Sequence, residues 1–342
     1  MEADWRKIVK NYNKPVNWKS NWQIFNSFAL YIVCWFVAYA AWDISAWLTL
    51  AVAMIAQVFF GRLFIIMHDC GHGNFYRSKK ARTFWGYMTG LVWFTPYWQW
   101  AKSHATHHRH SGNLDNRGIG DIWTLTVEEY SQASFSKKLM YRLYRFPLFE
   151  IFFGAFYIFF IFHRFTTKYD GKRERRSVYI TNALMVIMAV GISSITSFEF
   201  FAFYQFFLLL FGGALGITFF YVQHQYEEVY WRDSKEWDYE TAAMEGCSYL
   251  KLPKVLQWAS GNIGFHHIHH LSHSIPNYHL EKAYGENPSF RKSKIIELKD
   301  IWSCFWLGLY DAKNKKMIKF SELKSEKFSL EAMSTKEAKL TT

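Results

Sequence analysis

Lys and Arg are absent from two long stretches of the chain, residues 20–61 and residues 177–231. Each stretch contains two apolar runs, at about residues 22–42, 45–61, 178–195 and 200–223. A helix rises about 1.5 Å per residue, so each run crosses or nearly crosses a hydrocarbon core of about 30 Å. We therefore predict four transmembrane helices in two hairpins. A helix pair buried in a large soluble core is the alternative, but each run is apolar on all its faces, which disfavours it.

The positive charges collect at one end of both predicted hairpins. They lie in residues 6–19, 77–82 and 164–176, and no cation occurs at either hairpin turn. Because cytoplasmic flanks carry the excess of Lys and Arg, we expect the N-terminus, the C-terminus and the loop between the hairpins to be cytoplasmic. The net charge of +12 then orients the protein in a membrane, which would be the cytoplasmic membrane in a bacterium. No nucleic-acid partner is expected.

Two shorter apolar stretches, about residues 84–97 and 148–162, are marginal for spanning. We interpret them as interfacial or re-entrant helices on the cytoplasmic leaflet, since a single crossing would disturb the sidedness. Two further spans, which would place residues 100–147 outside, are the alternative. The predicted fold is an all-α integral membrane protein with a cytoplasmic helical cap. Its regions are a basic N-terminus (1–20), a membrane domain (21–285) and a C-terminal region (286–342) with a flexible tail from residue 313.

Histidine is abundant, with 14 residues, and eight of them lie in three tight clusters. The clusters are His68/His72, His104/His107/His108 and His266/His269/His270. Residues three or four apart share a helix face, so each cluster is expected to direct its imidazoles to one point. Eight imidazoles exceed the four ligands of a tetrahedral zinc and the axial ligands of a haem. The four cysteines show no CxxC pair. The pattern therefore predicts a dinuclear, histidine-rich metal site at the cytoplasmic membrane surface, in the cap.

These clusters resemble the three histidine boxes of the membrane fatty acid desaturases. The boxes read HDCGH (68–72), HATHH (104–108) and HHIHH (266–270), and the segments YVQHQYEEVYW and GNIGFHHIHHLSHSIPNY resemble the bacterial acyl-lipid group, related to Bacillus-type and to plant and cyanobacterial Δ12 enzymes. The resemblance covers about residues 20–285. It implies an O2-dependent oxidoreductase that introduces a cis double bond into the acyl chain of a membrane lipid. It also implies a di-iron cofactor with O2 as co-substrate.

The resemblance implies nine metal ligands, the eight box histidines and His224. They are His68, His72, His104, His107, His108, His224, His266, His269 and His270. In the related stearoyl-CoA enzymes an Asn precedes the ninth histidine by four residues; Phe220 stands there in this chain. No HPGG haem signature and no GxGxxG fingerprint is present, so an external electron donor is expected, a ferredoxin or a flavodoxin by analogy.

Further residues have predicted supporting roles. Asp69, Asn262, His267 and Glu227 are candidates to hold the ligands in place through hydrogen bonds. Trp93, Tyr97, Trp98 and Trp100 are candidates to line an acyl channel. A plain interfacial aromatic belt is the alternative for these four.

Two other functions fit part of the pattern. One is a lipid or alkane hydroxylase or a carotenoid oxygenase of the same superfamily, because these enzymes share the boxes. The other is a non-catalytic, histidine-rich metal transporter. Transporters place their ligands near the bilayer midplane, whereas these clusters are predicted at or beyond the ends of the spans. Desaturation remains the preferred interpretation.

Overall fold

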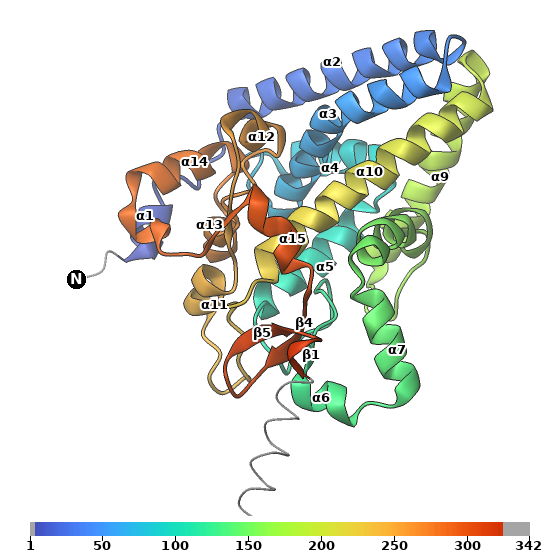
Figure 1. Ribbon diagram of the computed structural model, residues 1–342. Coiled ribbons are helices and arrows are strands. Elements are labelled where there is room, and N and C mark those ends of the chain that lie inside the picture. Colours follow the sequence, from blue (N-terminus) through green and yellow to red (C-terminus); the bar gives the residue numbers. More distant parts are fainter. Residues whose placement is uncertain (1–3, 324–342) are drawn as a thin grey trace, which may run out of the picture.

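Four long helices dominate the structure, a computed structural model that describes residues 4–323. They are α2 (Asn17–Trp42), α3 (Ala46–His72), α9 (Lys172–Ile195) and α10 (Phe198–His224). Each is long and apolar enough to cross a membrane. Helix α2 pairs with α3, α9 pairs with α10, and the two hairpin turns lie near each other at one end of the molecule (Figure 1). The predicted membrane fold with four spans in two hairpins is confirmed.

Helix α3 extends well beyond its predicted end at residue 61. The prediction stopped at the first cation, Arg62, which instead lies buried in the middle of the helix. Its guanidinium donates to the Ser27 hydroxyl at 3.2 Å and to the Trp258 carbonyl, and it lies 3.9 Å from the centre of the Trp258 ring. Hydrogen bonds and an aromatic face replace the water that this cation has lost. The first histidine cluster is therefore part of a spanning helix.

The two shorter apolar stretches form helices that differ from simple spans. Helix α4 runs from Lys79 to Val92 and therefore ends before residue 97. At 1.5 Å per residue it is about 21 Å long, shorter than a hydrocarbon core of about 30 Å. The second stretch is an irregular helix made of η1 (Phe149–Phe153), α8 (Gly154–Phe156), η2 (Tyr157–Ile161) and η3 (Phe162–Arg164). Helix α7 (Phe135–Tyr144) precedes it at an angle of 80°, and the two together would count as a fifth, bent span.

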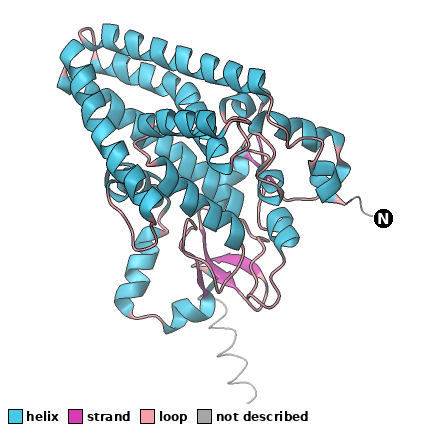
Figure 2. Cartoon of the chain, turned by 180° about the vertical axis from the view of Figure 1, so that it is seen from behind, coloured by secondary structure: helices cyan, strands magenta, loops and turns pink. Residues whose placement is uncertain are grey.

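The rest of the described chain is a cap of short helices and two small sheets. The helices are α1 (Trp5–Val9), α5 (Tyr97–His110), α6 (Val127–Gln132), α11 (Tyr239–Glu245), α12 (Lys254–Ala259), α13 (His266–Leu271), α14 (Asn277–Glu286), η4 (Pro288–Arg291), η5 (Leu298–Asp300) and α15 (Ile301–Cys304). The strands are β1 (Leu125–Thr126), β2 (Tyr249–Lys251), β3 (Ile295–Glu297), β4 (Leu307–Asp311) and β5 (Lys316–Lys319). A sheet in the order β1-β4-β5 lies at the end opposite the hairpin turns (Figure 2). Strands this short leave no alternating pattern, and the sequence predicted none.

The C-terminal region shares its core with the membrane domain. Strand β3 pairs in parallel with β2, which lies before the predicted boundary at residue 286. Phe305 stacks on Tyr221 of α10, with ring centroids 4.4 Å apart. The predicted flexible tail is wrong for residues 316–319, because β5 pairs with β4 and buries Met317 and Ile318. Residues 324–342 of that tail lie outside the described residues.

Close packing between α3 and α10 sets the position of their ends. Phe60 and Leu63 of α3 and Leu208 of α10 are fully buried in the same apolar cluster. At Gly212 of α10 a Cβ atom would lie 2.7 Å from the Phe60 ring, so the missing side chain lets the helices approach, as is common between membrane helices. As a result α3 and α10 end on the same side, with a histidine as the last residue of each.

Candidate metal centre

Nine histidines from four helices converge at the cap end of the bundle, and they form two groups. The five-histidine group contains His68, His72, His104, His108 and His269. The four-histidine group contains His107, His224, His266 and His270. Within each group the candidate ligand nitrogens lie within 4.8 Å of one another. All nine histidines implied by the resemblance are therefore brought together.

The second and third clusters each divide between the two groups, contrary to the expectation that each cluster addresses one point. The reason is the 100° rotation between successive helix residues. On α5, positions i and i+4 are only about 40° apart, so His104 and His108 join the five-histidine group. The i+3 residue, His107, lies about 60° to the other side and joins the four-histidine group. Helix α13 divides in the same way, with His269 as its i+3 residue.

Glycines fix the places where two of these helices end or begin. Helix α3 ends directly after His72 because Gly73 adopts φ +80°, a left-handed conformation that favours glycine, and its N–H caps the last turn. Helix α13 begins two residues after Gly264, where a Cβ would lie 2.5 Å from the Leu250 carbonyl oxygen. This close approach seats α13 against the strand β2. The two glycines thus help to place the C-terminal end of α3 and the N-terminal end of α13 close to α5.

Burial keeps five of the cap histidines neutral. The pKa values of His104, His108, His266, His269 and His270 lie well below the ordinary value. Burial is the largest cause for each of them, and the neighbouring imidazoles lower the pKa further. Neutral imidazole is the form that offers a lone pair to a metal ion. These five histidines therefore offer a lone pair for ligation at neutral pH.

The inner nitrogens of the histidines face one another rather than other protein groups. Within the described residues, the Nε2 atoms of His68, His72 and His270 are buried and have no hydrogen-bond partner. Other Nε2 atoms point at each other, 2.9 Å apart between His224 and His266 and 3.1 Å apart between His104 and His108. A buried polar atom without a partner is costly, and a cation at the centre of each group would satisfy these atoms. The residues fit two metal ions with affinity for imidazole.

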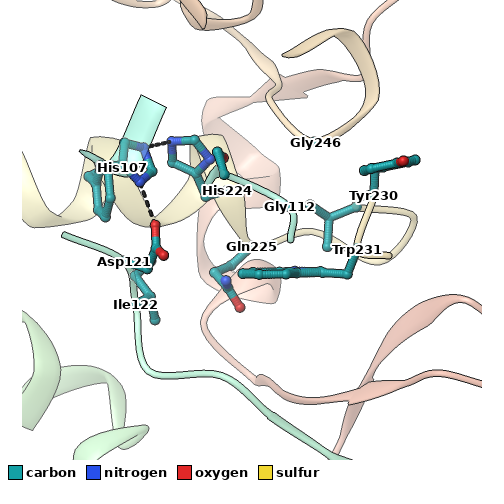
Figure 3. Close-up of a pocket in the computed structure, with 12 residues that line it drawn as sticks. His107, Gly112, Asp121, Ile122, His224, Gln225, Tyr230, Trp231 and Gly246 are labelled. Carbon is teal, nitrogen blue, oxygen red and sulfur yellow. Dashed lines mark hydrogen bonds and ion pairs between the residues drawn. The ribbon is translucent and has the colours of Figure 1, made fainter. Parts of the chain in front are cut away.

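Two buried carboxylates each contact the Nδ1 atom of one histidine of the site. Asp121 Oδ1 lies 2.5 Å from His107 Nδ1, and His107 Nε2 faces His224 Nε2 at 3.2 Å (Figure 3). Asp69 Oδ1 lies 2.9 Å from His68 Nδ1, so this predicted supporting residue contacts a candidate ligand. A carboxylate on one ring nitrogen fixes the tautomer and leaves the other nitrogen free for a metal. Each group thus contains one oriented imidazole.

Cys247 is a neighbour of the site that the sequence did not indicate. Its buried sulfur lies 3.7 Å from His224 Nδ1. It comes 23 residues after His224 and belongs to no motif, so only the fold brings the two together. The thiol gives His224 a polar neighbour where His107 has a carboxylate.

Three predicted supporting residues do not touch the candidate ligand nitrogens. Buried His267 points to the other side of α13, where its Nε2 lies 2.8 Å from the Phe290 carbonyl oxygen. Burial lowers its pKa to about 4, so it stays neutral and ties α13 to η4. Asn262 donates to the Asn277 carbonyl oxygen. Glu227 is exposed and forms an ion pair with Lys316. These residues support the cap rather than the ligands.

The four aromatic candidates for an acyl channel separate into three roles. Trp100 contacts the site, since its ring stacks on His104 with centroids 4.6 Å apart. Trp93 and Tyr97 are buried and donate to carbonyl oxygens of α3, those of Phe60 and Cys70. Trp98 lies on a groove at the outer surface of the bundle. The cavity beside His107 and His224 has a volume of about 10 Å³ (Figure 3), room for about one water molecule.

Comparison with known proteins identifies the family. The family model for fatty acid desaturases matches residues 45–295, a range that includes all nine histidines. A protein of Bacillus subtilis (strain 168) described as a fatty acid desaturase is 41% identical over 334 residues, 98% of this chain and 95% of its own length. The chain belongs to the fatty acid desaturase family. Members of this family are oxidoreductases, so the resemblance seen in the three boxes is confirmed and the protein is an enzyme.

More distant relatives match most of the chain as well. An sn-1 oleoyl-lipid 12-desaturase of Picosynechococcus sp. is 27% identical over 288 residues, 81% of this chain and 81% of its own. An sn-1 acyl-lipid omega-3 desaturase (ferredoxin) of Nostoc sp. is 25% identical over 279 residues, 77% of this chain and 74% of its own. The similarity to members of the family therefore extends through the membrane helices and the cap.

Proposed function

We propose that this enzyme introduces a cis double bond into the acyl chain of a membrane lipid, with O2 as the oxidant, at two iron ions held by nine histidines. The observation that carries the proposal is the pair of adjacent groups of imidazoles, buried between the ends of apolar helices. The five-histidine group would hold one iron and the four-histidine group the other. The rings of His108 and His270, one from each group, stack with centroids 4.0 Å apart.

The metal pair would supply the oxidising chemistry, because no side chain can break an unactivated C–H bond. Two C–H bonds of neighbouring methylenes give up two hydrogen atoms, and a donor adds two electrons with two protons. Together they reduce one O2 to two waters and leave a C=C bond. Burial keeps His104, His108, His266, His269 and His270 neutral. Asp69 and Asp121 orient His68 and His107. Trp100 covers His104 on the side of α3 and limits water access there.

We propose an external electron donor, of the ferredoxin or flavodoxin class. Ferredoxin appears in the name of the Nostoc relative, and the chain carries a net charge of +12. A basic surface attracts acidic carriers and accelerates their encounter. A stimulation of turnover by reduced ferredoxin that falls with added salt would support this donor. Full activity with a small-molecule reductant alone would contradict a need for a docked carrier.

We further propose that the histidine groups, the N-terminus and the C-terminus face the cytoplasm. The proposed regions are the basic N-terminus (1–20), the membrane domain (21–285) and the C-terminal region (286–342). The cations flank the ends of the helices next to the histidines, and the turns at residues 43–45 and 196–197 carry none. The native cysteines are all buried, so an Asp43→Cys variant gives a clean label site. We expect that cysteine to react with an impermeant reagent from outside, and reaction only from the cytoplasmic side would overturn the orientation.

The function is tested by expression in a host that makes only saturated lipids, with the acyl chains analysed by gas chromatography–mass spectrometry. We expect a new unsaturated chain with a cis double bond. A hydroxylated chain would instead support the hydroxylase alternative. An unchanged lipid profile from a folded, iron-loaded protein with a working donor would overturn the proposal.

A matched pair of variants on α5 completes this test. His107→Ala removes a member of the four-histidine group and is expected to abolish product and lower bound iron. His110→Ala removes a histidine that belongs to neither group but lies on the same helix. Its product and iron should match the parent. Equal activity in both variants would remove His107 from the site.

A further inference from the structure

A groove lies between α4 and α9 on the outer surface of the bundle. Its volume is about 410 Å³, within the usual range of ligand pockets, about 300–1,000 Å³. Thr83 and Tyr87 of α4 line one wall, a face of α9 lines the other, and Trp98 of α5 contributes its ring. The groove shares no residue with either histidine group. It is therefore a second concave site, which the proposed reaction does not use.

The α9 wall changes from charged to apolar along its length. Arg173, Arg176, Ile180 and Leu184 line the groove, and their spacing of three or four residues puts them on one helix face. Leu184 lies eleven positions after Arg173, about 16 Å along the helix at 1.5 Å per residue. The charged end lies at the start of a candidate span, and the apolar end lies toward the middle of that span. The groove is thus amphipathic along the axis of α9.

The charged end keeps positive charge that the protein does not neutralise. Residues 168–176 contain five cations and two carboxylates. Glu174 accepts from the Gly171 N–H and pairs with Arg173 at 3.0 Å, and Asp170 accepts from the Thr167 N–H and the Gln99 amide. The Arg173 guanidinium is also held 4.2 Å from the centre of the Trp98 ring. Among residues 4–323, no hydrogen bond or ion pair involves the Arg176 side chain.

We propose that this groove binds an anionic phospholipid, with the phosphate at Arg173 and Arg176 and one acyl chain along Ile180 and Leu184. Guanidinium donors match phosphate oxygens in geometry and charge. The acyl chain gains little by leaving the bilayer, which is equally apolar, so the arginines set the preference for an anionic headgroup. The apolar half explains why the ligand is a lipid, since a soluble anion would leave it unfilled. Binding here does not depend on the proposed desaturation.

Native mass spectrometry of the delipidated, full-length protein tests the proposal directly. Phosphatidylglycerol and phosphatidylcholine with identical acyl chains are offered in turn. We expect the anionic lipid to be retained about tenfold better, and the Arg173→Gln/Arg176→Gln double variant to lose that preference, because each nearby cation favours anionic headgroups. Arg175→Gln is the matched control, an exposed neighbour that does not line the groove and whose Nε donates to the Asp170 carbonyl. Equal retention of both lipids by the parent would overturn the proposal.

A second variant tests the apolar half of the groove without touching the arginines. Leu184→Trp fills the space beside Tyr87 and is expected to reduce retention of phosphatidylglycerol several-fold. Unchanged retention in this variant, or full competition by inorganic phosphate alone, would show a plain anion site and overturn the lipid assignment. Unchanged thermal melting in phosphatidylcholine confirms that each variant is folded. If the double arginine variant does not fold, Arg176→Gln and Leu184→Trp together decide the result.

Discussion

The two histidine groups share two helices but differ in the third. Helices α5 and α13 contribute to both. The five-histidine group adds His68 and His72 from successive turns of α3, whereas the four-histidine group adds the single His224 at the end of α10. The first therefore has one more imidazole and rests on a recognisable HxxxH motif. The second depends on how α10 packs. This difference suggests that the four-histidine group tolerates the loss of a ligand less well.

The largest expected effect comes from removing one ligand from each group. His266→Ala leaves three imidazoles in its group, and His72→Ala leaves four in the other. Both variants should lose activity by on the order of 100-fold or more, beyond the cost of removing an outer partner. Bound iron, measured by inductively coupled plasma mass spectrometry, should fall further in His266→Ala than in His72→Ala. Equal iron loss in the two variants would remove the asymmetry between the groups.

The next effect separates orientation from stability at the two carboxylates. Asp121 Oδ1 binds His107, while its Oδ2 accepts from the Gly118 N–H. Asp69 binds His68 and also accepts two hydrogen bonds from Asn277, at 2.7 and 2.8 Å. Asp121→Asn should lower activity or iron affinity by about 10- to 100-fold with a small change in melting temperature.

Asp69→Asn should lower both iron affinity and stability. The amide replaces an acceptor of buried hydrogen bonds, each worth about 1.5–3 kcal/mol with a charged partner. Thermal melting of both variants, made without iron, measures the difference. A larger loss of stability in Asp121→Asn than in Asp69→Asn would contradict this division of roles.

The smallest expected effect concerns the thiol beside the four-histidine group. Cys247→Ala removes the sulfur 3.7 Å from His224 Nδ1, and the five-histidine group should be unaffected. We expect a loss of activity of no more than about 10-fold, the lower end for a partner of a ligand. Cys304→Ala is the control, a buried cysteine that belongs to neither histidine group. Matching activities in the two variants would show that the thiol has no role in holding His224.

The sequence alone predicted the membrane class, the eight box histidines and a dinuclear, histidine-rich metal site. Apolar runs free of cations are long enough to be recognised as spans in the sequence. The i, i+3, i+4 spacing of the histidines lies within one helix, so it is visible in the sequence too. His224 came only from the resemblance, because a single histidine at a helix end carries no spacing signal.

The tertiary structure decided how the histidines are divided between the two groups. His107 and His269 each belong to a different group from the i, i+4 pair of histidines on the same helix. It also extended α3 through Arg62, whose charge is satisfied by Ser27 and Trp258 from distant parts of the chain. The partners of His107 and His224, Asp121 and Cys247, lie on segments that only folding brings together. Local rules follow from the geometry of one helix, but these contacts depend on packing between helices, which no local pattern records.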